Sequence, residues 1–150
     1  INKMDPQKRA RQLEDGRHHL RVSIAAYRRQ MQRGRYFLHE HPEGAKSFEE
    51  PEMIELQAEE GVYTVKGPMC RFDLQPIGPH GKPITGDSTE GPAFCRKETV
   101  WVTNSTQLAD RLHGVCSNKD GTRPWHRHVH LFGGLAHFAR VYSPKFLTAI

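Results

Sequence analysis

Apolar residues in the first third of the chain recur with the period of an α-helix. Asp5-Pro6 places a capping acceptor and a first-turn proline at its start, and apolar side chains then recur at steps of three, four and seven. These side chains are Leu13, Leu20, Ile24, Tyr27 and Met31. The spacing predicts one long amphipathic helix with a single buried face, and Gly34 is placed to end it.

Three later segments have the apolar, β-branched or aromatic composition of strands. They are residues 35–39, 62–66 and 99–104. The first carries Tyr36-Phe37-Leu38 and stops at Pro42, which cannot donate to a strand ladder. We therefore expect short strands separated by other elements.

Capping patterns predict three further helices. Ser47-Phe48-Glu49-Glu50 has the form of a capping box, with Pro51 next and Gly61 as the stop. Asn104 or Ser105 could cap a short third helix, and Ser143-Pro144 could begin a last one. Between strands, residues 67–98 are rich in Gly and Pro and predict a long loop, of a length that is usually either functional or disordered.

The order of these elements predicts a layered α/β fold. Helix and strand alternate along a chain of 150 residues and 17.2 kDa, which suits one domain over residues 1–150. Ligands in such folds bind beyond the carboxyl ends of parallel strands. His39, Glu40 and His41 follow the first strand, so we expect them to face a crevice together.

Charge is distributed unevenly along the chain. Residues 1–35 hold ten basic and three acidic side chains, and residues 36–60 hold one basic and eight acidic ones. A basic helix can face a polyanion, or it can be a solvated face paired with the acidic segment that follows. Both interpretations stay open from the sequence.

Composition indicates an intracellular protein without a membrane span. Mean hydropathy is −0.72, and no run approaches the roughly 20 apolar residues that a span needs. Cys70, Cys95 and Cys116 are an odd set without a Cys-x-x-Cys pair, which favours reduced thiols. The chain begins with Ile, and we expect it to be part of a longer reading frame.

Histidine and cysteine side chains raise the alternative of a zinc site. His126, His128 and His130 alternate and would share one face of a strand. The other candidate ligands are Cys116, His113, His39 and His41. The spacing fits no standard structural zinc pattern, so we expect no metal and assign these histidines to a crevice lining or to hydrogen bonds.

Four blocks of sequence resemble a known family. They are "GRYFLHEHP", "RKETVWVTNS", "HRHVHLFGG" and "VYSPKFLTAI". In this order and spacing they resemble the carboxyl-terminal half of Rossmann-type, AdoMet-dependent domains related to DNA cytosine-5 methyltransferases, found alone or embedded in retrotransposon polyproteins. The resemblance covers essentially the whole chain.

The resemblance implies a particular sheet. It implies a partial Rossmann-like methyltransferase sheet with flanking helices, in which strands 35–39, 99–104 and 62–66 lie in that spatial order. The middle strand would run antiparallel to both neighbours. The missing amino-terminal half of the domain would adjoin strand 35–39, which would otherwise be an exposed edge.

The resemblance also implies roles for individual residues. Glu40 stands where the family's glutamate holds a flipped base, and is the expected catalytic residue. The expected substrate-binding residues are His39, His41, Arg96, Lys97 and Asn104, although helix capping also explains Asn104. The expected nucleic-acid-binding residues are Arg17, Arg21, Arg28, Arg29, Arg71 and Trp125, the last as a lid or a stacking platform.

The expected function is therefore the base-facing half of a nucleic-acid methyltransferase-like domain, inactive alone. S-adenosyl-L-methionine would bind the full-length parent and not this part, because the chain has neither a Gly-x-Gly-x-x-Gly loop nor a Pro-Pro-Cys motif. The expected partner is nucleic acid, DNA rather than RNA, and the location is nuclear if the source is a eukaryotic mobile element. The alternative is a non-catalytic nucleic-acid-binding or scaffolding domain of a retrotransposon polyprotein.

Overall fold

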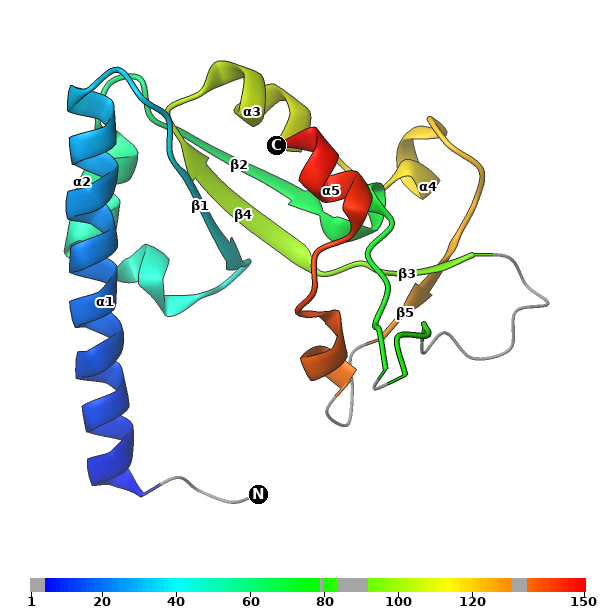
Figure 1. Cartoon of the computed structure of the whole chain (residues 1–150), viewed down its shortest axis with the longest axis horizontal. Helices are drawn as coiled ribbons and strands as arrows, with labels where there is room; N and C mark the ends of the chain where they lie inside the picture. The colour runs from blue at the N-terminus through cyan, green and yellow to red at the C-terminus, as the bar shows by residue number, and fades with distance from the viewer. Residues whose placement is uncertain (1–4, 79, 84–91, 131–134) are drawn as a thin grey trace.

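The computed structural model describes residues 5–78, 80–83, 92–130 and 135–150 (Figure 1). The α-helices are α1 (Pro6–Gln32), α2 (Pro51–Ala58), α3 (Thr106–Leu112), α4 (Ser117–Asp120) and α5 (Pro144–Ala149). The strands are β1 (Leu38–Pro42), β2 (Tyr63–Pro68), β3 (Ala93–Cys95), β4 (Glu98–Thr103) and β5 (Arg127–Val129). Single 3₁₀ turns occur at η1 (Lys46–Glu49), η2 (Met69–Phe72) and η4 (Leu135–Ala139).

The fold is mixed α/β, with a three-stranded antiparallel sheet and a separate parallel pair. The three strands lie in the order β1-β4-β2, and β4 runs antiparallel to both neighbours. This confirms the expected spatial order and the antiparallel middle strand. The second sheet pairs β3 with β5 in parallel, and the sequence did not predict it.

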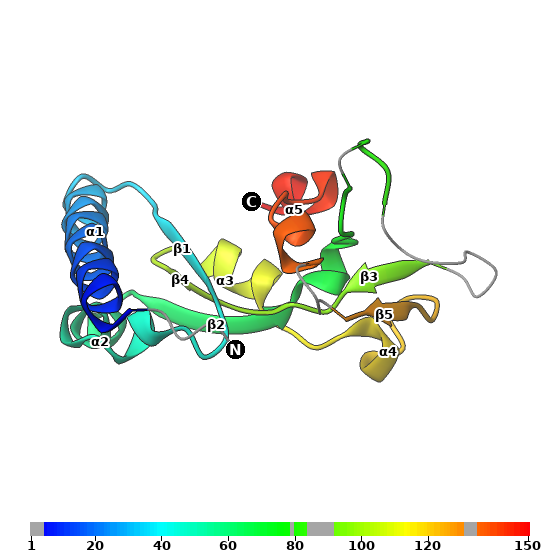
Figure 2. The same ribbon diagram turned by 90° about the horizontal axis from the view of Figure 1, so that it is seen from below.

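Helices cover both faces of the three-stranded sheet (Figures 1 and 2). On one face Val102 of β4 joins a buried cluster with α1 and α2, which includes Ile24 and Leu56. On the other face Trp101 packs with Leu112 of α3 and Phe146 of α5. Successive strand residues point to opposite faces, so the neighbours Trp101 and Val102 anchor two different cores.

The long amphipathic helix predicted at the amino terminus is confirmed as α1. The Asp5 side chain accepts a hydrogen bond from the Lys8 N–H, and Leu20 and Ile24 are buried. Gly34 follows the helix with φ of 66°, a left-handed conformation that glycine adopts without a Cβ penalty.

Three predicted boundaries were wrong. β1 spans residues 38–42 rather than 35–39, because the backbone of residues 35 and 37 bonds to the Asn104 side chain instead of to a strand. The expected capping box at residues 47–50 is a 3₁₀ turn without a side-chain cap bond, and α2 begins at Pro51. Residues 67–98, expected to be one loop, include η2 and β3.

No helix in the described ranges is both long enough and apolar enough to span a membrane.

Candidate functional site

The Glu40 carboxylate is held by two side chains that come from distant parts of the chain. Glu40 lies on β1 opposite Trp101 and on the same face of the sheet as α5. One carboxylate oxygen accepts from Lys97 Nζ at 3.2 Å, and the other accepts from the Tyr142 hydroxyl at 2.5 Å. The Glu40 and Lys97 side chains retain only 18% and 21% exposure. The result is a partly buried carboxylate with a fixed orientation.

Tyr142 stays protonated in this arrangement and donates a hydrogen bond to Glu40. Burial, followed by the hydrogen bond to Glu40, raises the pKa of Tyr142 above its ordinary value. Lys97 also lies over the Tyr142 ring, with Nζ 5.8 Å from its centroid. Sequence analysis missed Tyr142, because it is 102 residues from Glu40 and no local pattern links the two.

His39 and His41 do not converge with Glu40. Strand alternation places both on the opposite face, where they line a cavity of about 360 Å³ between α1, β1 and η1. His39 Nδ1 lies 3.2 Å from the Tyr27 hydroxyl, and His41 Nδ1 lies 2.5 Å from Ser47 Oγ. The expected joint crevice of the three titratable groups is therefore wrong.

His39 is held as a neutral imidazole. Burial, and then the neighbouring His41, lower its pKa to about 4. Its Nε2 atom is buried and has no hydrogen-bond partner within the described ranges. A charged imidazolium would be costly in such surroundings.

Two other expected substrate-binding residues already have hydrogen-bond or ion-pair partners within the protein. The Asn104 side chain donates to the Arg35 carbonyl and accepts from the Phe37 N–H, both at 2.9 Å, and so fixes the entry to β1. Arg96 Nε lies 2.6 Å from a Glu98 carboxylate oxygen. Ser105, not Asn104, caps α3. Lys97 is thus the basic residue of this strand end that the structure brings to Glu40.

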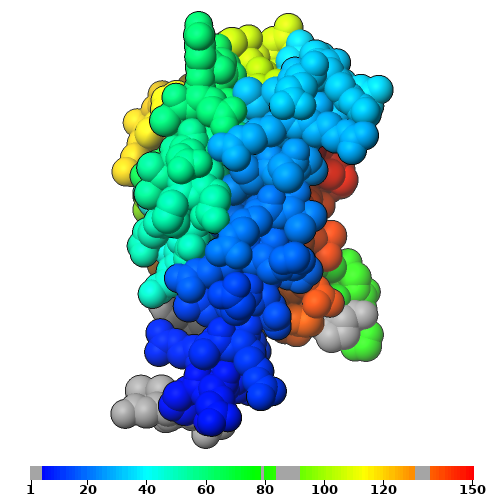
Figure 3. Space-filling model, turned by 90° about the vertical axis from the view of Figure 1, so that its left-hand side faces the viewer, coloured from blue at the N-terminus to red at the C-terminus, as the bar shows by residue number. Residues whose placement is uncertain are grey.

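The basic face of α1 meets the acidic residues that follow it in the sequence. Figure 3 shows α1 and α2 lying side by side on one face of the molecule. Ion pairs join Arg17 to Glu50 at 3.1 Å, Arg21 to Glu52 at 2.9 Å and Arg28 to Glu59 at 2.6 Å. Arg29 is exposed, and the part of the chain that the structure describes shows no ion pair for it. The charge pattern left two interpretations open. The paired helix face accounts for three of the four α1 arginines that were expected to bind nucleic acid.

Of the other two residues expected to bind nucleic acid, Arg71 is bonded to the backbone and Trp125 is exposed. Arg71 Nη1 donates to the carbonyls of Leu112 and His113 at 3.1 and 2.8 Å, where α3 ends. Trp125 is 63% exposed and therefore available to a partner. Neither residue adjoins Glu40 through any contact in the described ranges.

A group of cysteine and histidine side chains meets between η2, α4 and β5. The ligand atoms of Cys70, Cys116, His126 and His128 all lie within 4.8 Å of one another. Burial is the main cause that raises the pKa of Cys70 to about 12 and lowers the pKa values of His126 and His128. The sequence analysis considered three of these four residues and missed Cys70, because the four come from three separate segments.

The remaining candidate zinc ligands lie elsewhere. His39 and His41 line the cavity beside α1, and His113 follows the end of α3. His130 is outside the four-residue group. The structure thus selects a set of ligand atoms that no spacing pattern in the sequence defined.

Comparisons with family models, with curated protein sequences and with solved structures find no match to this chain. Two arrangements in the described residues can carry chemistry: a positioned carboxylate, and a buried group of thiols and imidazoles.

Proposed function

We propose that this chain is the base-facing half of a nucleic-acid methyltransferase-like domain. The observation that carries the proposal is the Glu40 carboxylate, oriented at the sheet by Lys97 and Tyr142. The strand order β1-β4-β2, with β4 antiparallel, is the order that the sequence resemblance implied. A Rossmann-like parent fold belongs to the same proposal.

In this function Glu40 contacts the ring of an extruded base. Nucleophilic attack on a pyrimidine ring builds negative charge at the ring nitrogen, and a carboxyl group can share a proton with that atom. Each carboxylate oxygen has two lone pairs, so an oxygen bonded to Lys97 or Tyr142 can still accept from an exocyclic amino group. Lys97 and Tyr142 act as positioning residues because they fix the plane of the carboxylate.

In this proposal S-adenosyl-L-methionine is bound by the other half of the domain and not by this chain. The sequence has no glycine-rich phosphate or cofactor loop and no Pro-Pro-Cys nucleophile motif. In a complete domain the cofactor supplies the methyl group and is held by the other half. The role of this chain is to bind and orient the base, on DNA rather than RNA, in the nucleus if the source is a eukaryotic mobile element.

The second candidate is a non-catalytic nucleic-acid-binding or scaffolding domain of a retrotransposon polyprotein. One observation favours it: both Glu40 oxygens already have protein partners, which is also the arrangement of a structural ion pair. In that case Glu40 serves only to join β1, β4 and the segment before α5.

Glu40→Gln, made in the complete reading frame that encodes this chain, separates the two candidates. Glutamine keeps the shape, and its carbonyl oxygen can accept from Lys97 while its amide N–H₂ donates to the Tyr142 hydroxyl oxygen, but it cannot share a proton with the base. Methyl transfer to duplex DNA should fall by about 100-fold or more, while the affinity for the same DNA stays unchanged. Tritiated methyl incorporation and fluorescence anisotropy measure the two quantities.

Glu43→Gln is the matched control. Glu43 follows the same strand, is 48% exposed at its side chain and pairs with Lys66 on the surface. This variant should retain full methyl transfer. If Glu40→Gln also retains it, Glu40 has no part in the reaction, and an inactive parent protein would support the scaffolding role.

A further inference from the structure

Three of the four atoms of the cysteine–histidine group have the spacing of a tetrahedral metal site, and the Cys70 sulfur lies within 4.8 Å of each of them. His126 Nε2 and His128 Nε2 are 3.1 Å apart, and Cys116 Sγ lies 3.5 and 3.3 Å from them. Zinc bonds of about 2.0–2.1 Å to nitrogen and about 2.3 Å to sulfur, at tetrahedral angles, require about 3.3 Å between nitrogens and about 3.6 Å between nitrogen and sulfur. The observed separations are close to both values.

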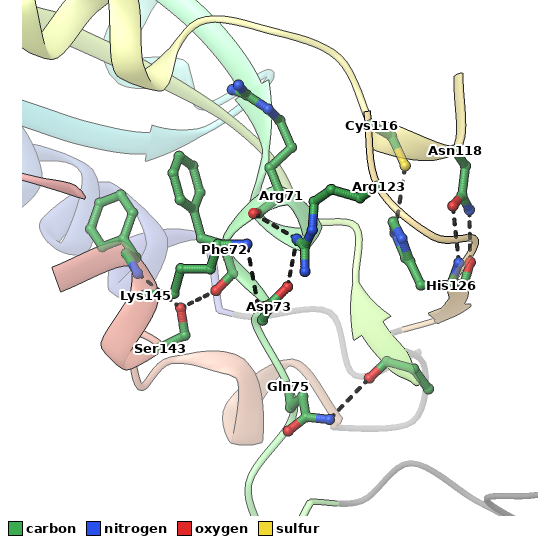
Figure 4. A network of polar contacts seen from close by, with 12 residues as sticks. Arg71, Phe72, Asp73, Gln75, Cys116, Asn118, Arg123, His126, Ser143 and Lys145 are labelled. Carbon is green, nitrogen blue, oxygen red and sulfur yellow. Dashed lines mark hydrogen bonds and ion pairs between the residues drawn. The ribbon is translucent and has the colours of Figure 1, made fainter. Parts of the chain in front are cut away.

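The group is buried and its backbone is fixed. Cys70, Cys116 and His126 are each no more than 3% exposed. The Asn118 amide accepts from the His126 N–H at 3.0 Å and donates to the His126 carbonyl at 2.7 Å, as Figure 4 shows. The ring of Phe94 packs against the His126 ring at 5.3 Å. The imidazole is thus held in place before any ion binds.

Hydrogen bonding alone satisfies this group poorly. In a hydrogen bond between the two Nε2 atoms, one nitrogen carries the proton and the other accepts it, so the remaining contacts must be made by the sulfur atoms. Thiols are weak donors and acceptors. A cation at the centre would satisfy two thiolates and two neutral imidazoles at once. Two sulfur and two nitrogen ligands in tetrahedral positions favour zinc, and four protein ligands leave no open position for catalysis.

We propose that Cys70, Cys116, His126 and His128 bind one structural zinc ion. The ion would join η2 and the start of α4 to β5, one of the two strands of the parallel pair β3-β5. β3 and β5 have three residues each, and a two-stranded sheet of that size is marginally stable by itself. Metal binding supplies folding free energy to such a region.

The zinc ion would also stabilise the contacts that position Tyr142, the hydrogen-bond donor to Glu40. η2 contains Cys70, and the carbonyl of its last residue, Phe72, accepts a hydrogen bond from Ser143. Ser143 follows Tyr142, the donor to Glu40. Figure 4 shows Phe72, the last residue of η2, between His126 and Ser143. The proposal does not depend on the methyltransferase-like function.

The test is metal analysis of the full chain, purified under reducing conditions without chelator. We expect about one zinc ion per chain in the wild type and near zero in Cys116→Ser and His128→Asn. Cys95→Ser and His137→Asn are the matched controls, because Cys95 is a buried cysteine of another cluster and His137 is an exposed histidine. Both controls should keep the ion.

Cobalt substitution gives a readout that does not depend on the variants folding. Wild-type chain stripped of metal and refolded with Co²⁺ should show tetrahedral d–d absorption and a thiolate-to-cobalt charge-transfer band, and one equivalent of Zn²⁺ should abolish both. Wild-type protein without zinc that also gives no charge-transfer band would overturn the proposal. Loss of the ion from Cys95→Ser to the same extent as from Cys116→Ser would overturn the ligand assignment.

Discussion

Single-residue alternation along β1 separates three neighbouring titratable side chains. His39 and His41 line the cavity beside α1, whereas Glu40 faces Lys97 and Tyr142. The sequence analysis placed these residues at the end of a strand and gave them one common crevice, whereas all three lie within β1. The expected strand ended at residue 39, and β1 extends through Glu40 and His41 to Pro42, so the alternation of a pleated strand applies to all three.

The neutral His39 predicts a loss of stability in acid. Its pKa is about 4 in the folded protein and about 6.5 when unfolded, so the unfolded state binds the proton more readily. The contribution of neutral His39 to the free energy of unfolding is fully present above about pH 6.5. It falls as the pH drops toward 4, by a total of about 3 kcal/mol. Urea unfolding at several pH values measures this change.

His39→Gln should remove that part of the pH dependence. The difference in unfolding free energy between wild type and His39→Gln should shift by about 3 kcal/mol in favour of the variant between pH 7 and pH 4. His18→Gln, at an exposed position on α1, should follow the wild-type curve. Parallel curves for the wild type and His39→Gln would show that His39 is not buried as a neutral group.

At the scale of elements, α1 and α2 join through opposite charges as well as through a buried stripe. Three arginines of α1 pair with Glu50, Glu52 and Glu59, while Ile24 and Leu56 pack beneath them. Exposed pairs of this kind are worth about 0–1 kcal/mol each. The apolar contact therefore holds the helices together, and the ion pairs set which basic side chains stay available to a partner.

Arg28 and Arg29 provide a matched test of nucleic-acid binding by α1. Arg29→Ala should weaken binding to duplex DNA and reduce the slope of log affinity against log salt by about 1, because one phosphate contact is lost. Arg28→Ala should change that slope less, because its guanidinium already bonds to Glu59 at 2.6 Å. Fluorescence anisotropy over a salt series measures both slopes, and equal losses would contradict the assignment.

β2 and α3 approach each other at a position that only glycine fits. A Cβ on Gly67 would lie 2.6 Å from the Leu112 carbonyl oxygen and 3.3 Å from the Trp101 ring. Gly67→Ala should therefore destabilise the protein by about 1–3 kcal/mol, as overpacking does. Denaturant unfolding measures the loss.

Gly16→Ala is the control for that variant. A Cβ at Gly16, within α1, meets nothing within 4 Å, and alanine favours a helix interior over glycine. It should stabilise the protein by about 0.5–1 kcal/mol. A neutral Gly67→Ala variant would contradict the close packing of β2 on α3.

At the scale of the whole molecule, one strand connects two cores. β4 is central, and its consecutive residues Trp101 and Val102 serve opposite faces. β1 lies at the edge of this sheet, where Pro42 is tolerated because its missing N–H interrupts no central ladder. An edge strand of this kind can accept a further strand, which is what a larger methyltransferase-like sheet would require.

The linear sequence predicts the helices and strands whose signals lie within a few neighbouring residues. The period of apolar residues gave α1, the Ser143-Pro144 pair gave the start of α5, and β-branched runs gave β2 and β4. These signals act over one to seven residues, so a linear pattern contains them completely. The strand order came from the resemblance and not from the pattern.

Tertiary structure alone decided which distant side chains meet. Asn104 replaces strand pairing at residues 35 and 37, Tyr142 reaches Glu40, and Cys70 joins Cys116 and two histidines. Each contact closes a long loop, and its partner is set by how helices and turns pack on the sheet rather than by spacing along the chain. The sequence therefore specifies the segments of this protein, and the packing of those segments creates both of its candidate sites.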